Sequence, residues 1–358
     1  MPGTRQAAQA LVVLVAGAAA VLPRPETAVE RLYGGAWYPA IQAALTGASN
    51  HLPIAVFDGA LVCLVVVVAW WWTRAFGALW RRRLLAPAIR AAAATLTLAA
   101  ALYLWFLVVW GLNYARPPVE QRLGLSAGAP AAADVAMLLD EAVASANALY
   151  LDSRTVAFEP SRTDADVARA LHAVEARHGR SRPSVPGTPK PTLLAPYFRM
   201  AGVDGLTAPV ALETLLNPDL TAPERPFVLA HEWAHLSGYA PEADANFIAW
   251  LVTQEPGTAP RTAYSGWLFL VSEAARQVPA ATRRASLAAL AAGPRQDLAD
   301  IATRMASRVD LVERVGWRVY DSYLRSQGVE DGVRSYSRVI DLIVRARRRA
   351  ATTPSVPQ

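Results

Sequence analysis

The chain has 358 residues, of which 53% are hydrophobic, and its formal net charge is +6. The apolar excess lies in residues 1–115, which excludes an ordinary soluble protein and predicts a membrane region followed by a domain large enough to bury a core. The single cysteine, Cys63, excludes an intrachain disulfide framework and a multi-cysteine zinc site.

Three apolar runs in the N-terminal part of the chain are suited to crossing a bilayer, at about 6–22, 53–73 and 91–112. The first run is short, and we interpret it as an uncleaved anchor. Arg5 before it and the small residues near its end would also fit a signal peptide.

Arginines between the second and third runs indicate the orientation of the spans. They are Arg74, Arg81, Arg82, Arg83 and Arg90. Cytoplasmic loops are enriched in arginine and lysine, so this segment favours a cytoplasmic loop over a nucleic-acid-binding surface, and we expect no nucleic-acid partner. We therefore expect a membrane region at 1–112, in contact with the lipid bilayer, and an extracytoplasmic domain at 113–358.

The second part of the chain is predicted to be mainly α-helical. Helical spacing covers 131–151 and 164–178, and a weak alternation at 207–216 predicts one edge strand. From Thr221 to about Ala350 the pattern is helical, with breaks at Pro256, Pro279, Gly293-Pro294 and Gly328. The predicted fold is three transmembrane helices followed by a helix-rich domain with at most a small β-sheet.

Polar side chains gather within one apolar helical segment, which is predicted to begin with a capping box at Thr221–Glu224 and to end at Gly238. His231 and His235 are four residues apart, which places both imidazoles on one helix face, where they can share a zinc ion (Zn²⁺). Glu232 between them can reach a metal-bound water and act as the general base.

A third zinc ligand is expected from the helix that starts after Pro241. Glu242 lies in its first turn and is the expected ligand, with Asp244 as the rival. Asn246, one turn further, faces the same way and can orient a ligand imidazole through its other ring nitrogen. Burying these polar groups unpaired would cost several kcal/mol, which a bound metal ion offsets.

Amide hydrolysis also needs a hydrogen-bond donor for the tetrahedral oxyanion. Tyr264, Tyr320 and Tyr336 are the candidates. Tyr264 ranks first because it follows the two site helices most closely.

The stretch HEWAHLSGYAPEADANF (231–247) resembles the zinc site of the gluzincin metallopeptidases, with Glu242 and Asn246 at the positions of the ligand glutamate and its neighbouring Asp/Asn. The gap between the two motif helices is shorter than in the commonest gluzincins. Nearly the whole chain is similar to a family of bacterial membrane proteins of unknown function that have three N-terminal spans. Further matching stretches are ERLYGGAWYP (30–39), AYSGWLFL (263–270), VYDSYLRSQG (319–328) and GVRSYSRVIDL (332–342).

The resemblance implies a zincin-like domain carried by the cytoplasmic (inner) membrane of a bacterium. We therefore expect a membrane-anchored zinc metallopeptidase that cleaves peptide or protein substrates. A zinc-binding membrane sensor or pseudoenzyme and a cell-wall amide hydrolase remain alternatives. The intact Glu232 favours an enzyme, since a structural zinc site needs no base.

Overall fold

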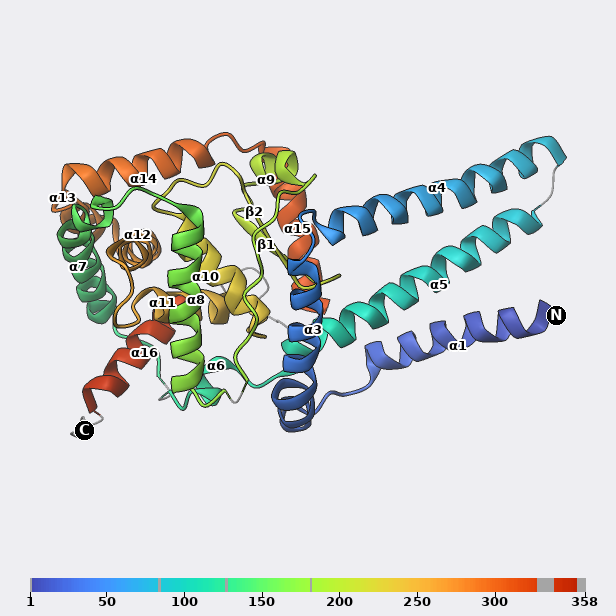
Figure 1. Cartoon of the computed structure of the whole chain (residues 1–358), viewed down its shortest axis with the longest axis horizontal. Helices are drawn as coiled ribbons and strands as arrows, with labels where there is room; N and C mark the ends of the chain where they lie inside the picture. The colour runs from blue at the N-terminus through green and yellow to red at the C-terminus, as the bar shows by residue number, and fades with distance from the viewer. Residues whose placement is uncertain (1, 83–84, 126–127, 181, 327–337, 353–358) are drawn as a thin grey trace.

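Three apolar helices leave one side of a helical body in the computed structural model, which describes residues 2–82, 85–125, 128–180, 182–326 and 338–352 (Figure 1). They are α1 (Pro2–Val21), α4 (Val56–Arg82) and α5 (Ala86–Val109), and each is long and apolar enough to cross a membrane. α4 continues past the predicted end of the second span at residue 73, because no proline interrupts the helix before Pro87.

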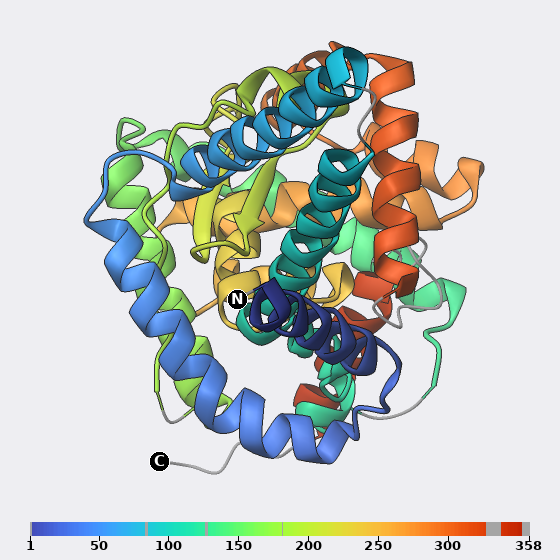
Figure 2. The same cartoon turned by 90° about the vertical axis from the view of Figure 1, so that its right-hand side faces the viewer.

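A segment between α1 and α4 crosses the base of the three apolar helices (Figure 2). It consists of α2 (Glu26–Ala28), the π-helix η1 (Val29–Trp37) and α3 (Tyr38–Asn50). Tyr33 and Tyr38 from this segment belong to the same buried core as Trp110, which follows α5, and as the helices of the body. One core therefore runs across residue 112, where the sequence suggested a boundary between membrane region and domain.

The body is built from helices, which confirms the predicted mainly α fold. Its central helices are α7 (Ala132–Leu149), α8 (Pro160–Arg177), α10 (Arg225–Leu236), α11 (Glu242–Thr253), α12 (Pro260–Gln277) and α16 (Arg338–Thr352). Around them lie η2 (Gly111–Ala115), α6 (Val119–Arg122), η3 (Asp152–Arg154), α9 (Ala195–Ala201), α13 (Ala280–Ala288), α14 (Ala292–Met305) and α15 (Asp310–Ser326). The predicted break at Gly328 lies outside the described residues.

The segment predicted as one edge strand, 207–216, forms most of an antiparallel hairpin. β1 (Gly205–Ala208) pairs with β2 (Glu213–Leu216), so that Thr207 lies opposite Thr214. The small sheet is thus confirmed, but a turn divides it, and Leu212 in that turn has a φ of 50°. β1 packs on α10, which brings the hairpin to the segment that carries both motif histidines.

A buried ion pair ties the hairpin to the start of α4. The Glu213 carboxylate accepts hydrogen bonds from the backbone N–H groups of Val56 (2.9 Å) and Phe57 (2.8 Å). Lys190 Nζ donates to Glu213 Oε1 at 2.7 Å and to the carbonyl and hydroxyl oxygens of Ser49 at 2.6 Å. Because every one of these polar groups finds a partner, the charges can be buried at the junction between sheet and membrane helix.

Candidate metal centre

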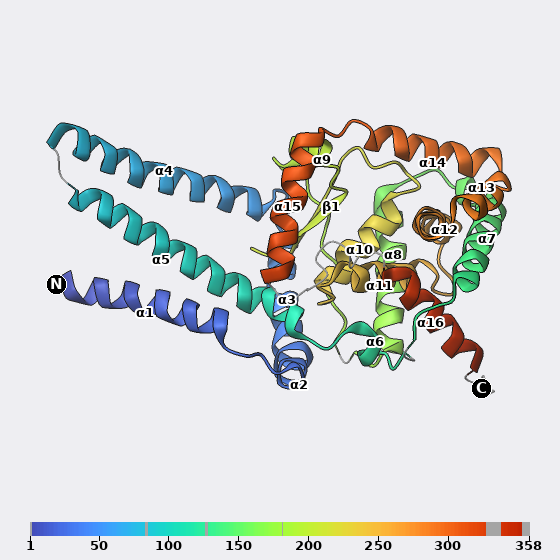
Figure 3. The same cartoon turned by 180° about the vertical axis from the view of Figure 1, so that it is seen from behind.

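A tight reversal between α10 and α11 brings the two halves of the motif together in the interior of the body (Figure 3). Gly238 follows α10 with a φ of 86°, and a Cβ there would lie 2.6 Å from Arg116 Nη1. Glycine is therefore required by backbone conformation and by space. α10 begins at Arg225, later than predicted, because Thr221 and Glu224 form a preceding turn in which the Glu224 carboxylate accepts the Thr221 N–H.

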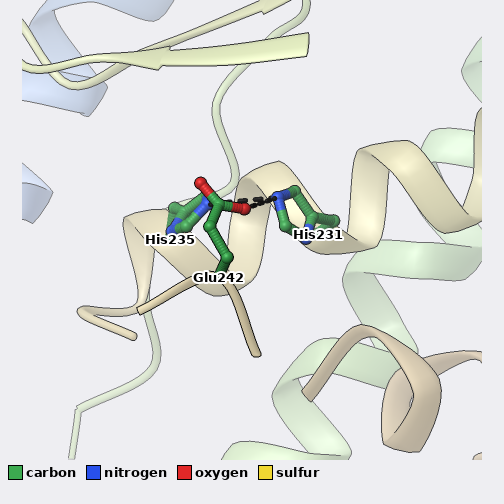
Figure 4. A group of neighbouring side chains, drawn as sticks. All are labelled: His231, His235 and Glu242. Atoms are coloured by element: carbon green, nitrogen blue, oxygen red, sulfur yellow. Dashed lines mark hydrogen bonds and ion pairs between the residues drawn. The ribbon is translucent and has the colours of Figure 1, made fainter. Parts of the chain in front are cut away.

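His231, His235 and Glu242 converge on one point, with the Glu242 carboxylate directed at both imidazoles (Figure 4). The two Nε2 atoms are 3.1 Å apart, and Glu242 Oε2 lies 3.2 Å from His231 Nε2 and 3.7 Å from His235 Nε2. Ligand atoms bound tetrahedrally to one zinc ion at about 2.1 Å are separated by roughly 3.4 Å. The spacing of the three atoms therefore fits a shared metal ion.

The other ring nitrogens show how each imidazole is held. His235 Nδ1 lies 2.8 Å from the carbonyl oxygen of Tyr239. A carbonyl can only accept, so Nδ1 carries the proton and a neutral His235 directs the Nε2 lone pair at the cluster. His231 Nδ1 is buried and has no hydrogen-bond partner among the described residues.

The cluster is strongly coupled electrostatically. Burial alone would raise the pKa of Glu242, but the imidazoles of His235 and His231 hold that pKa well below its ordinary value. Burial opposes the charged form of His235, yet the Glu242 carboxylate outweighs this effect and raises the pKa of His235 from 6.5 to about 9. The Glu242 carboxylate and the His235 imidazole thus stabilise each other's charged form.

The raised pKa of His235 predicts how the stability of the chelated protein depends on pH. Because folding raises this pKa from 6.5 to about 9, its stabilisation is complete below pH 6.5 and is lost as pH rises through 9. We therefore expect the thermal unfolding midpoint of the wild-type protein, freed of metal by a chelator, to decrease as the pH is raised from 7 to 9. The midpoint of the His235→Gln variant, treated in the same way, should decrease less. Equal slopes for the two proteins would contradict the prediction.

Glu232, the predicted base, is buried next to the hairpin. The Thr207 hydroxyl lies 2.9 Å from Glu232 Oε2 and 2.9 Å from its carbonyl oxygen. A Cβ on Gly205 would lie 2.5 Å from Glu232 Oε1, so the absence of a side chain there makes room for the carboxylate. Burial raises the pKa of Glu232, and the two imidazoles oppose this only in part. A carboxylate with a raised pKa binds a proton more readily, which suits a group that has to accept and return one.

Asn246 and Asp244 are both buried on α11, but in the described part of the chain neither forms a hydrogen bond or ion pair with the imidazoles. No hydrogen bond within the described residues joins Asn246 to His231 or His235: the Tyr239 carbonyl holds Nδ1 of His235, and Nδ1 of His231 has no partner there. Asp244 Oδ2 accepts the Val119 N–H at 3.3 Å, so the rival third ligand is directed towards α6.

Tyr264 is fully buried, but the structure does not bring it together with the three cluster residues. Its hydroxyl donates to Asp297 Oδ2 at 2.5 Å, and its ring packs edge-on against Tyr150. The hydroxyl is thus hydrogen-bonded to a residue of α14, and we assign Tyr264 no catalytic role. Nothing is described of the side chain of Tyr320, and Tyr336 lies outside the described residues.

The membrane-proximal part of the chain supplies neighbours of the site that the sequence did not reveal. The Trp110 ring packs edge-on against His235 at a centroid distance of 5.8 Å. The Tyr38 hydroxyl donates to the carbonyl oxygen of Leu236 at 3.0 Å. Arg116, which follows η2, is buried, forms a two-point ion pair with Glu30 at 2.6 and 2.9 Å, and donates to the carbonyl of Gly238.

Comparison with known proteins adds a family but no activity. The model of a family described as a protein of unknown function (DUF3810) matches residues 33–344, a range that contains α3, the hairpin and both motif helices. No curated protein and no solved structure matches the chain.

Proposed function

The chain belongs to the DUF3810 family, and from its His231–His235–Glu242 cluster we propose that it is a membrane-anchored zinc-dependent hydrolase of amide bonds. In this proposal it is a metallopeptidase acting on peptide or protein substrates. Its body lies on the extracytoplasmic side of a bacterial cytoplasmic membrane, as the arginines between α4 and α5 and the family resemblance suggest.

The observation that supports the proposal most strongly is the convergence of three lone-pair donors in a buried place. The three atoms lie between 3.1 and 3.7 Å from one another, and the Nδ1–H of His235 is held by a carbonyl. Once the imidazoles are unprotonated, lone pairs at such distances repel one another unless a cation lies between them. Two imidazoles and one carboxylate are a typical ligand set of catalytic zinc, because three protein ligands leave one position open.

Bound zinc would lower the pKa of a coordinated water to about 7 and polarise the scissile carbonyl. Glu232 would then take the proton of the attacking water and pass it to the leaving amine. Thr207 keeps one carboxylate oxygen of Glu232 in place through a hydrogen bond of 2.9 Å. This held, buried base favours a hydrolase over a zinc-binding sensor, which has no use for a proton acceptor.

The full-length protein purified in detergent should contain about one zinc ion per chain by elemental analysis, as three converging protein ligands predict. The His231→Ala and His235→Ala variants should lose it, since each removes one of the three ligands. His51→Ala is the matched control, because His51 is an exposed histidine in the loop before α4 and should leave the zinc content unchanged. Equal zinc in all four proteins would mean that the metal is bound elsewhere and would overturn the proposal.

A further inference from the structure

The segment formed by η1 and α3 has its polar side turned inward. Tyr38, Gln42, Thr46 and Ser49 recur at helical spacing, and all four are buried against the body. The Gln42 amide donates to the carbonyl of Val185 at 2.8 Å, and the Thr46 hydroxyl donates to that of Leu212 at 2.8 Å. The polar groups of this segment are therefore used to attach it to the body.

The outward side of the same segment is apolar. Apart from Arg31 near the start of η1, its exposed side chains are Leu32, Ala36, Trp37, Ala40, Ala44 and Ala48. The two largest are 52% (Leu32) and 65% (Trp37) exposed, and residues 32–50 contain no charged residue. A helix on a water-facing surface carries the opposite pattern, with its apolar stripe inward and its charges outward.

The position of the segment indicates what covers this side. α1 precedes it and α4 follows it, and both are candidate membrane spans. Figure 1 shows α3 between the body and the three apolar helices and running across them, and Figure 2, seen from the side of those helices, shows α3 uncovered in front of the body. The side that faces away from the body is thus continuous with the surface from which the spans emerge.

We propose that η1 and α3 lie along the bilayer surface, with the Leu32–Ala48 side in contact with lipid and the polar side attached to the body. Burying Leu32 and Trp37 in the interfacial layer removes their apolar surface from water, and tryptophan favours that layer. The lack of charges between residues 32 and 50 fits a contact with the outer part of the acyl chains, where a charged side chain would be costly.

This arrangement fixes the candidate metal centre close to the membrane. Tyr38 reaches from α3 to the carbonyl oxygens of His235 (3.5 Å) and Leu236 (3.0 Å). If the chain acts as the hydrolase proposed above, its substrates are therefore polypeptides attached to the same membrane. That step rests on the proposed function, whereas the lipid contact of α3 does not.

The lipid contact can be measured by attaching a nitroxide to single cysteines in the full-length protein, reconstituted in vesicles of phosphatidylcholine and phosphatidylglycerol. Cys63→Ser removes the only native cysteine, which lies exposed on α4 and serves in the wild type as the lipid-facing reference. Ala40→Cys and Ala44→Cys probe α3, and Ala285→Cys is the matched control, an exposed alanine on α13 at the opposite end of the body (Figure 1). Each variant is used only if it keeps the thermal midpoint of its parent.

The measured quantity is the ratio of the nitroxide's collision frequency with molecular oxygen, which is apolar, to its collision frequency with a water-soluble nickel chelate. At positions 40 and 44 this ratio should be several-fold higher than at 285 and should approach the ratio at Cys63. A ratio equal to that at 285 would mean that α3 faces water. Few collisions with either reagent would mean that protein, such as a second copy, covers it. Either result would overturn the proposal.

The substrate class has a separate test, in which a mixed peptide library is supplied to the same vesicles with or without an N-terminal palmitoyl chain. We expect the anchored library to be cleaved several-fold faster. Equal rates would refute membrane-attached substrates while leaving the hydrolase intact. Cleavage of neither library would count against the proposed function, and the nitroxide result would still stand.

Discussion

Replacing Glu232 with glutamine is expected to reduce hydrolysis by about 10²- to 10⁴-fold, the usual contribution of a positioned general base. Glutamine has nearly the same shape and can still meet the Thr207 hydroxyl, which lies 2.9 Å from Oε2, but it cannot accept the proton of water. His231, His235 and Glu242 are untouched by the change, so the zinc content should stay at that of the wild type.

The measurement is peptide hydrolysis together with metal analysis of the same preparation. Glu141→Gln, a partly exposed glutamate paired with Arg347 on the body surface, is the matched control and should keep full activity. Turnover by the Glu232→Gln protein at the rate of this control would show that the base is wrongly assigned. Retained zinc with no hydrolysis by any of the three proteins would instead favour the sensor.

Replacing Lys190 with methionine is expected to lower the free energy of unfolding by about 3 kcal/mol, because it leaves Glu213 as a buried charge without its counter-ion. The Lys190 and Glu213 side chains are 3% and 0% exposed. The loss stays at the lower end of the usual range for a broken buried pair, since the N–H groups of Val56 and Phe57 still donate to Glu213.

Thermal unfolding in detergent, followed by tryptophan fluorescence, measures this loss. Arg199→Met is the matched control, because it breaks an ion pair with Asp219 whose side chains are 46% and 43% exposed, and an exposed pair contributes at most about 1 kcal/mol. The double variant Lys190→Met/Glu213→Gln should recover part of the stability. A Lys190→Met protein as stable as the Arg199→Met protein would contradict the assignment.

The local part of the candidate site could be predicted from the sequence. Histidines four residues apart in an α-helix lie on the same face, independently of the tertiary fold, and Pro241 marks the start of the next helix. His231, His235 and Glu242 are therefore found together as expected. The mainly helical fold was predictable for the same reason, since apolar periodicity is a local signal.

The remainder of the site depends on contacts that span the chain. Tyr38 and His235 are 197 residues apart in the chain. The group that orients His235 is the backbone carbonyl of Tyr239, and every residue has such a carbonyl, so the amino-acid type at position 239 does not indicate this role. Tyr264 was chosen for its closeness along the sequence, but its face of α12 is directed at α7 and α14. A signal for Tyr38 did exist, because it lies in the stretch ERLYGGAWYP, which is one of those that carry the family resemblance.

The core that runs across residue 112 has a consequence for any form of this protein that is freed from its anchor. A chain cut at residue 113 would leave behind Trp110, which packs on His235, and Tyr38, which holds the end of α10. It would also leave Arg116 without its ion-pair partner Glu30. Proteolytic shedding would thus remove side chains that hold His235 and the end of α10, and the candidate metal centre keeps these contacts only while the body remains joined to its N-terminal helices.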